Sequence, residues 1–229
     1  YIDCLDRFHP KAPASDPSVR YGRGPYLKTR IAKPRSLKDV QRTYSRYGIK
    51  PRWFREDLQA LRPPDLIMIT SMMTYWYTGV QETIAVLREI FPDTKIILGG
   101  IYASLCRKHA LRNSGADEIF AGPGEESLFE LIARWTGFTT TPHFNPQELD
   151  TYAYPALDLQ NHINYVPLLT SRGCPFKCTY CASYFLNPGR MRRTPKSVIE
   201  EIKFWHQTHQ VSDFILYDDA FLANAEKHA

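Results

Sequence analysis

The sequence predicts an α/β protein that begins with a parallel, Rossmann-like sheet and ends in the first part of a β/α barrel. Two observations carry this prediction: short apolar segments alternate with amphipathic helical patterns from residue 65 to 135, and a second alternation starts at residue 165. Parallel neighbours need a long crossover between them, so a strict alternation of strands and helices favours a parallel sheet. We expect a ligand to bind at the carboxyl ends of the strands.

The chain divides by composition into four parts. Residues 1–62 form a basic arm rich in proline, arginine and tyrosine, residues 63–136 hold the first alternation, residues 137–164 form a linker, and residues 165–229 hold the second alternation. A complete barrel takes about 200 residues or more, so we expect the last part to be the truncated start of one.

Two short helices are predicted in the arm, after an extended stretch. Ser36 is a good N-cap for a helix over 37–47, which Gly48 would end. A second helix over 53–61 would stop at the pair of prolines that follows it.

Strands and helices alternate through the rest of the chain. In the first alternation we expect strands over 65–71, 95–98 and 117–120 and helices over 79–90, 102–113 and 125–135. After the linker, strands over 165–170 and 214–217 flank a helix over 195–208, for which Thr194 is the N-cap and Pro195 the first helical residue.

Charge is unevenly distributed along the chain. The formal net charge of +5 comes from 29 Lys and Arg and 24 Asp and Glu, and residues 1–62 hold 15 of the basic and 6 of the acidic residues. The remainder is therefore mildly acidic. No apolar run approaches the roughly 20 residues that span a bilayer, which argues against an integral membrane protein. A nucleic-acid-binding surface would be confined to the arm, where aromatic residues lie among the arginines.

Three of the five cysteines fall in one short segment, SRGCPFKCTYCAS, with the spacing C-x3-C-x2-C. Three thiolates on one loop, Cys174, Cys178 and Cys181, suit an iron–sulfur cluster or zinc. They leave open the fourth position that a structural zinc site would fill. The alternatives are a zinc site completed by a distant histidine and three unrelated buried thiols. Such few, unevenly placed cysteines fit a reducing, cytoplasmic setting.

This cysteine motif, with Tyr180 before its last cysteine and a strand before its first, resembles the signature of the radical S-adenosylmethionine (SAM) superfamily. The resemblance implies a [4Fe–4S] cluster on the three cysteines and SAM on its unique iron, whose reductive cleavage yields a 5′-deoxyadenosyl radical. It also implies that Asp218 or Asp219 contacts the methionyl amine, with a turn or capping role as the alternative. The nearby Arg190, Arg192 and Arg193 are predicted to form a basic patch that is either solvated, which we favour, or in contact with an anionic ligand.

The first alternation resembles the cobalamin-binding domain that precedes the barrel in part of this superfamily. Ser71-Met72-Met73 stands at the family's SxL position, with Met for Leu, and a glycine pair follows 25 residues later. The segment GADEIFAGPGEES is similar to the family's third-strand turn. The cobalamin residues implied by the resemblance are Ser71, Met73, Thr74, Gly99, Gly100, Gly122, Gly124 and Glu125.

The sequence departs from the cobalamin pattern at two places. The Asp-x-His-x-x-Gly loop that supplies a lower axial histidine is absent, and His9, in DRFHP, does not fit it. Tyr102 stands where relatives often carry histidine after the glycine pair. The aromatic stretch over 73–77 would lie on the cofactor face, where it would pack on the corrin ring or line a contact between domains.

Three hypotheses follow. The leading one is a radical SAM enzyme with a cobalamin-binding domain that acts on a small-molecule or peptide substrate. The resemblance implies a flavodoxin- or ferredoxin-type electron donor and a reaction that is either methyl transfer to an unactivated carbon, as in many relatives, or a rearrangement or ring contraction. The second is a radical SAM enzyme whose Rossmann-like unit no longer binds cobalamin. The third is a zinc-stabilised nucleic-acid-binding module that uses the arm. We expect the 229-residue chain alone to be inactive, because its barrel is incomplete.

Overall fold

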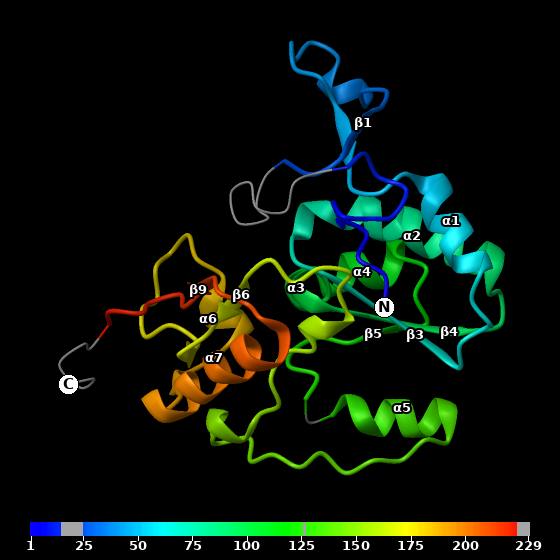
Figure 1. The fold of residues 1–229 in the computed structure, drawn as a ribbon. Coiled ribbons are helices and arrows are strands. Elements are labelled where there is room, and N and C mark those ends of the chain that lie inside the picture. Colours follow the sequence, from blue (N-terminus) through cyan, green and yellow to red (C-terminus); the bar gives the residue numbers. More distant parts are fainter. Residues whose placement is uncertain (15–24, 126, 224–229) are drawn as a thin grey trace. The chain divides into compact units, whose positions relative to one another are not determined.

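The structure is a computed structural model that describes residues 1–14, 25–125 and 127–223 (Figure 1). The chain divides into two compact units. The first consists of Tyr1–Ala60, Tyr154–Leu168 and Glu200–Ile215, and the second of Leu61–Ala153, Leu169–Ile199 and Leu216–Ala229. Within the described ranges, every helix is too short or too polar to cross a membrane. Part of the predicted arm, residues 15–24, lies outside the described residues, as does the end of the predicted barrel segment, residues 224–229.

The second unit contains a three-stranded parallel sheet in the order β3-β4-β5, which confirms the predicted parallel α/β architecture. The strands are β3 (Leu66–Ser71), β4 (Lys95–Gly99) and β5 (Glu118–Ile119). The helices around them are η3 (Thr74–Trp76), α2 (Tyr77–Ile90), α3 (Gly100–Leu105), α4 (Arg107–Asn113) and α5 (Leu128–Thr136). Figure 1 shows α5 on one side of the sheet and α2 and α4 on the other.

Burial follows the position of each strand in the sheet. Three consecutive residues of the central strand β4, Ile96, Ile97 and Leu98, are at most 2% exposed, because helices cover both faces of the sheet. Helix α2 faces the interior with Ile84 and Leu87, one helical turn apart. Each such side chain contributes about 1.5–3 kcal/mol by leaving water. The strand–helix alternation therefore encodes the core of this unit.

The predicted helix over 102–113 is two helices, α3 and α4, separated at Cys106, whose backbone (φ −122°, ψ 38°) leaves the helical region. No proline or glycine marks this break, so the sequence does not reveal it. Both helices remain on the chain between β4 and β5, and the break leaves the crossover intact.

Asp117 ties together the beginnings of two strands and the end of α2. Its carboxylate accepts hydrogen bonds from Arg88 Nη2 at 2.6 Å, Lys95 Nζ at 3.2 Å and the Ile96 N–H at 2.8 Å. Partial burial raises the pKa of Asp117, but these hydrogen bonds outweigh it, so the pKa lies below its ordinary value. The ionised carboxylate is therefore the form that the folded state prefers.

This preference predicts acid-sensitive stability. The stabilisation by Asp117 is complete above the ordinary aspartate pKa of about 3.9 and is lost as the pH falls through the lowered folded-state pKa. We expect Asp117→Asn to be less stable than the wild type at pH 7 and to lose less stability between pH 7 and pH 3. Urea unfolding across this range measures both effects. Parallel pH profiles for the two proteins would contradict the prediction.

The first unit begins with an antiparallel ribbon of β1 (Lys28–Arg30) and β2 (Ser45–Tyr47), followed by α1 (Pro51–Gln59). Helix α1 confirms the predicted second helix, shifted by two residues. The helix predicted over 37–47 is wrong: this stretch contains the end of a 3₁₀ turn, η2 (Arg35–Leu37), and then β2. Pairing with β1 outweighs the local helical preference, and the exposed apolar side chains of the stretch would have given a helix no buried face.

The second predicted alternation of strands and helices forms a hydrophobic core within the first compact unit. Strand β6 (Val166–Leu168) pairs with β9 (Phe214–Leu216), and α7 (Pro195–His209) connects them along the chain. Thr194 caps α7 as predicted, because its Oγ1 accepts the Ser197 N–H at 3.2 Å. The core consists of Val166, Leu168, Trp205 and Val211, with partly buried neighbours around it. The described residues form one β/α unit here and no closed barrel.

The linker contains two 3₁₀ turns, η4 (Leu149–Thr151) and η5 (Leu157–Leu159). The remaining elements precede or follow the cysteine segment in the chain. Strand β7 (Ser171–Arg172) precedes it, and α6 (Ser183–Leu186) and β8 (Met191–Arg192) follow it.

Candidate functional site

The carboxyl ends of β3, β4 and β5 bring the three predicted cobalamin segments to one edge of the sheet. The parallel register sets Thr70 opposite Gly99, and a further bridge joins Ser71 to Gly100. The Phe120 N–H donates to Leu98 O, so the turn after β5 begins at the same level. The predicted residues Ser71, Met73, Thr74, Gly99, Gly100, Gly122, Gly124 and Glu125 all stand at or after these three strand ends in the chain.

Gly100 allows the closest backbone approach at this edge. Its φ of +84° suits glycine, and a Cβ there would collide with Thr70 Oγ1 and with the backbone N and O of Ser71. Ser104 joins the next turn, because its Oγ donates to Gly100 O at 2.9 Å and accepts the Gly122 N–H at 3.0 Å. Ser104 thus holds the Gly100 turn and the Gly122 turn together. A bulky ligand tail that lay against both turns would require them to be close to each other.

The aromatic stretch after β3 lies open at the same edge. Met72 is 61% exposed and Tyr75 68% exposed, and Met73 N-caps the 3₁₀ turn that starts at Thr74. Ser71, by contrast, is buried and donates its hydroxyl hydrogen to Met73 O at 3.1 Å. Apolar side chains that remain in water at a strand end are available to contact a flat, apolar ligand.

Tyr102 and His9, which depart from the cobalamin pattern, both contact other side chains of the protein. Tyr102 is 1% exposed, its hydroxyl lies 2.8 Å from His109 Nδ1, and burial raises its pKa. His9 is buried, with Nε2 2.8 Å from Asp57 Oδ2, and it stacks on Trp53. Neither side chain stands free to act as an axial ligand.

The cysteine loop is closed at its base by the antiparallel pair β7-β8, with Ser171 opposite Arg192 and Arg172 opposite Met191. Gly173, at φ +85°, follows β7 directly, and a Cβ on it would collide with the backbone oxygen of Gly189. The loop between these two glycines carries all three motif cysteines and α6. Tight closure of its base therefore sets where the thiols are presented.

All five cysteines are free thiols; Cys174 is half-buried, while Cys178 and Cys181 are exposed. The donor set, three soft sulfurs on one loop, fits an iron–sulfur cluster. Across residues 1–14, 25–125 and 127–223, no three His, Cys, Asp or Glu side chains are gathered closely enough to hold a metal ion. The loop thus has the donor types that a cluster needs.

The last cysteine has a distinctive environment. Hydrogen bonding with the Ser183 side chain and backbone N–H lowers the pKa of the Cys181 thiol, against desolvation and the charge of Asp219, which raise it. Cys181 Sγ lies 3.4 Å from Ser183 Oγ and 3.5 Å from the Ser183 nitrogen. Tyr180 is 91% exposed, and the neighbouring Cys178 raises its pKa. The motif thus presents its thiols and its tyrosine to solvent.

The two aspartates after β9 differ in their surroundings. Asp218 accepts hydrogen bonds from Ser171 Oγ at 2.7 Å, Thr170 Oγ1 at 2.9 Å and the Thr170 N–H at 3.1 Å. Asp219 is exposed. The pair is therefore split into one carboxylate used within the protein and one that faces solvent.

The prediction of a solvated arginine patch is wrong. Arg190 donates to the carbonyls of Ala220, at 2.8 Å, and Ala223, at 2.9 Å, and Arg192 donates to Ala223 O at 2.7 Å. The Arg193 guanidinium binds Ser197 Oγ at 2.9 Å. All three arginines are half-buried. Backbone carbonyls near the cysteine loop need hydrogen-bond donors, and the guanidinium groups supply them.

The cysteine loop and the segment that follows β5 are joined directly within the second unit. Arg172 Nη2 lies 2.8 Å from Glu125 Oε1, and the Arg172 guanidinium also lies over the Tyr152 ring, 4.9 Å from its centroid. Helix α6, which follows the last cysteine of the motif, contacts α3, which begins at Gly100. Glu125 is thus an ion-pair partner of the cysteine loop, and the two candidate sites are neighbours.

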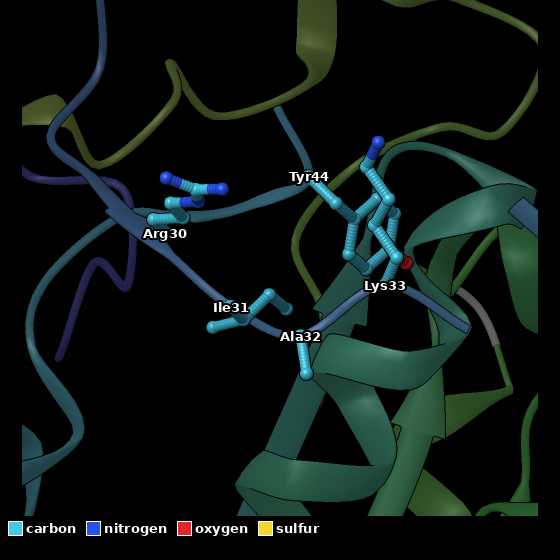
Figure 2. Close-up of a pocket in the computed structure, with 5 residues that line it drawn as sticks. All are labelled: Arg30, Ile31, Ala32, Lys33 and Tyr44. Atoms are coloured by element: carbon cyan, nitrogen blue, oxygen red, sulfur yellow. The ribbon is translucent and has the colours of Figure 1, made fainter. Parts of the chain in front are cut away.

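A separate hollow of about 490 Å³ lies in the N-terminal ribbon. Figure 2 shows Lys33 and Tyr44 side by side, with Arg30 farther along the ribbon. The Lys33 ammonium donates to the carbonyl of Val40. The residues that line the hollow, Arg30, Ile31, Ala32, Lys33 and Tyr44, include no thiol, carboxylate or imidazole, so we assign no chemistry to it.

Comparison with known proteins identifies the sheet. Residues 49–132 match the family model of the B12 binding domain. This part of the chain is a B12-binding domain. The match covers all of the sheet β3-β4-β5 and its carboxyl edge, and it begins before the boundary that composition suggested. No solved structure matches the chain.

Curated relatives extend the similarity beyond the B12-binding domain. The chain is 28% identical to the anaerobic magnesium-protoporphyrin IX monomethyl ester cyclase of Cereibacter sphaeroides, over 75% of this chain and 33% of that protein. It is 26% identical to the cyclase of the same name from Rubrivivax gelatinosus, over 72% and 35%. An uncharacterized methyltransferase of Pyrococcus horikoshii is 25% identical, over 72% and 41%. The chain spans about a third of the length of the cyclases.

These matches confirm the resemblance drawn from the sequence: the chain is distantly related to B12-binding radical SAM enzymes. Sequence reasoning did not find the contacts that hold the cysteine loop, because Thr170, Ser171 and Arg172 carry no motif of their own. Their position directly before the Gly-Cys step was the available signal.

Proposed function

We propose that this chain carries the cobalamin-binding domain and the cluster-binding loop of a radical SAM enzyme. One observation supports this most strongly: the edge of the B12-binding domain and the three-cysteine loop lie in one compact unit, joined by the ion pair of Arg172 and Glu125. Two cofactors that must act on one substrate need such proximity.

The proposed roles divide between the two loops. Cys174, Cys178 and Cys181 would hold a [4Fe–4S] cluster, and Asp219 and Tyr180 would face SAM. The edge residues from Ser71 to Gly124 would hold cobalamin, and Gly100 would let the backbone approach its nucleotide tail. When bound, the cluster with SAM supplies radical generation by one-electron reduction, and cobalamin supplies methyl transfer. A flavodoxin- or ferredoxin-type donor would provide the electron.

The finer activity that we propose is methyl transfer to an unactivated carbon, which the name of the P. horikoshii relative, a methyltransferase, supports. The second candidate is ring closure, supported by the cyclase names of the more similar relatives. Both would use the same two cofactor sites of this chain, so the test of the sites comes first.

Anaerobic reconstitution of the chain with iron and sulfide tests the cluster site. We expect about four iron atoms per chain, with the visible absorbance and the reduced-state EPR signal of a [4Fe–4S] cluster. Cys178→Ala should abolish this signal, and Cys106→Ala, outside the motif, should leave it unchanged. Bound zinc without iron would favour the zinc-stabilised module instead, and a wild-type chain that binds no iron would refute the proposal.

Cobalamin binding is tested separately, by the corrin absorbance that stays with the chain through gel filtration. Retention of cobalamin supports the leading proposal. A chain that assembles a cluster but retains no corrin would instead support a radical SAM enzyme whose Rossmann-like unit has lost the cofactor. The two measurements thus separate the two enzyme hypotheses.

A further inference from the structure

We propose that Asp218 is a positioning residue that fixes the cysteine loop through its side-chain oxygens, and that it is not the carboxylate that faces SAM. The inference rests on the proposed function for the identity of the bound groups. Its structural basis, the fastening of the loop, does not depend on a bound cofactor.

The contacts of Asp218 occupy its carboxylate. A single oxygen, Oδ1, accepts from Ser171 Oγ at 2.7 Å, Thr170 Oγ1 at 2.9 Å and the Thr170 N–H at 3.1 Å, and Oδ2 lies 3.1 Å from the same nitrogen. These three donors occupy most of the roughly four acceptor sites of a carboxylate. An added ammonium group would have to use the one that remains, on Oδ2, beside the Thr170 N–H.

Those contacts act on the entrance of the cysteine loop. Ser171 is buried and begins β7, and the next two residues lead directly to Cys174. Thr170 is also tied to the exit, because its carbonyl accepts the Arg193 N–H at 2.9 Å. The carboxylate of Asp218 therefore sets the point from which the first motif cysteine is presented.

The segment after Asp218 is fastened to the loop exit as well. Arg190 donates to Ala220 O and Ala223 O, and Arg192 donates to Ala223 O. Residues 218–223 thus bridge the two ends of the cysteine loop. Asp218 accepts hydrogen bonds from the loop entrance, and the carbonyls of Ala220 and Ala223 accept hydrogen bonds from the two arginines at the exit. Asp219 lies within this bridge and is exposed, so it is the carboxylate left to meet SAM.

The conservative variant separates the two roles. Asn at position 218 keeps an acceptor oxygen where Oδ1 stands but removes the charge, so a positioning role predicts that Asp218→Asn behaves like the wild type. A contact with the SAM ammonium would depend on the charge and would be lost. Asp218→Ala removes the acceptor and should release the loop entrance, because Ser171 and Thr170 then lose their partner.

The first measurement uses the chain without cofactor. Mass spectrometry follows alkylation of Cys174, the half-buried motif thiol, at pH 7. We expect Asp218→Ala to raise its labelling rate about tenfold and Asp218→Asn to change it less than about twofold, since labelling of a covered thiol reports local opening. Labelling of Cys106 is the internal control. An unchanged rate in Asp218→Ala would overturn the inference, whether or not the chain binds iron.

The second measurement uses the reconstituted chain, with SAM as the probe. Asp218→Asn should keep the iron content of the wild type and the change that SAM causes in the reduced-cluster EPR signal, whereas Asp219→Asn should keep the iron and need about tenfold more SAM for that change. The reverse pattern would make Asp218 the SAM-facing residue and overturn the inference. If Asp218→Ala does not fold by circular dichroism, Ser171→Ala and Thr170→Val replace it, with the same expected rise in Cys174 labelling.

Discussion

We expect Gly173→Ala to prevent assembly of the proposed iron–sulfur cluster and to destabilise the second unit by about 3 kcal/mol. The φ of +85° at this residue disfavours alanine, and the added Cβ would collide with the backbone oxygen of Gly189 and approach Asn187 O to 3.2 Å. Backbone atoms cannot rotate away as a side chain can, so the two ends of the cysteine loop must separate. Iron content after reconstitution and the urea unfolding midpoint measure the two effects.

Gly189 supplies the matched control. Its φ is +95°, but a Cβ there would meet no atom within 4 Å. Gly189→Ala should therefore cost only the left-handed conformation, about 1–2 kcal/mol, and should retain most of the iron. Equal iron contents in the two variants would show that closure of the loop base does not govern cluster binding.

Gly100→Ala should remove cobalamin binding and destabilise the B12-binding domain by a similar amount, about 3 kcal/mol. The Cβ would collide with Thr70 Oγ1 and would lie 2.8 Å and 2.9 Å from the backbone O and N of Ser71. Strand β3 and the start of α3 would have to separate at the edge where the ligand is proposed to bind. Corrin retained through gel filtration and thermal unfolding are the measurements.

Gly122→Ala is the corresponding control at the neighbouring turn. Gly122 has a φ of +94° and open space around a Cβ, so its replacement tests the backbone conformation without a collision. We expect a cost of about 1–2 kcal/mol and measurable corrin retention. If Gly122→Ala loses corrin as completely as Gly100→Ala, the close approach at Gly100 is not what shapes the site.

The ion pair of Glu125 with Arg172 links the B12-binding domain to the base of the cysteine loop. The family resemblance implied that Glu125 is a cobalamin residue, and that role stays a prediction. Its carboxylate, however, lies 2.8 Å from a guanidinium that belongs to the base of the cysteine loop. Glu125 therefore has a partner in the cysteine loop, and the ion pair links the B12-binding domain to that loop.

Much of the fold could be predicted from local sequence patterns. Alternating apolar segments locate β3 and β4, and in the central strand β4 the residues Ile96, Ile97 and Leu98 are buried. The step from Thr194 to Pro195 locates the start of α7, since capping is decided within one turn. Errors came where no local signal exists, as at the break at Cys106 and in the stretch that forms β2 by pairing with β1.

The sequence by itself determined the parallel α/β architecture and the distant relation to B12-binding radical SAM enzymes, because the cysteine spacing, the glycine turns and the strand–helix alternation are local patterns that need no folded partner to be recognised. Only the tertiary structure decided which side chains serve the proposed chemistry and which support it. Asp218 meets Ser171 across 47 residues of chain, and Glu125 meets Arg172 across another 47. Hydrogen bonds and ion pairs over such separations depend on how the elements pack, and no spacing rule encodes them.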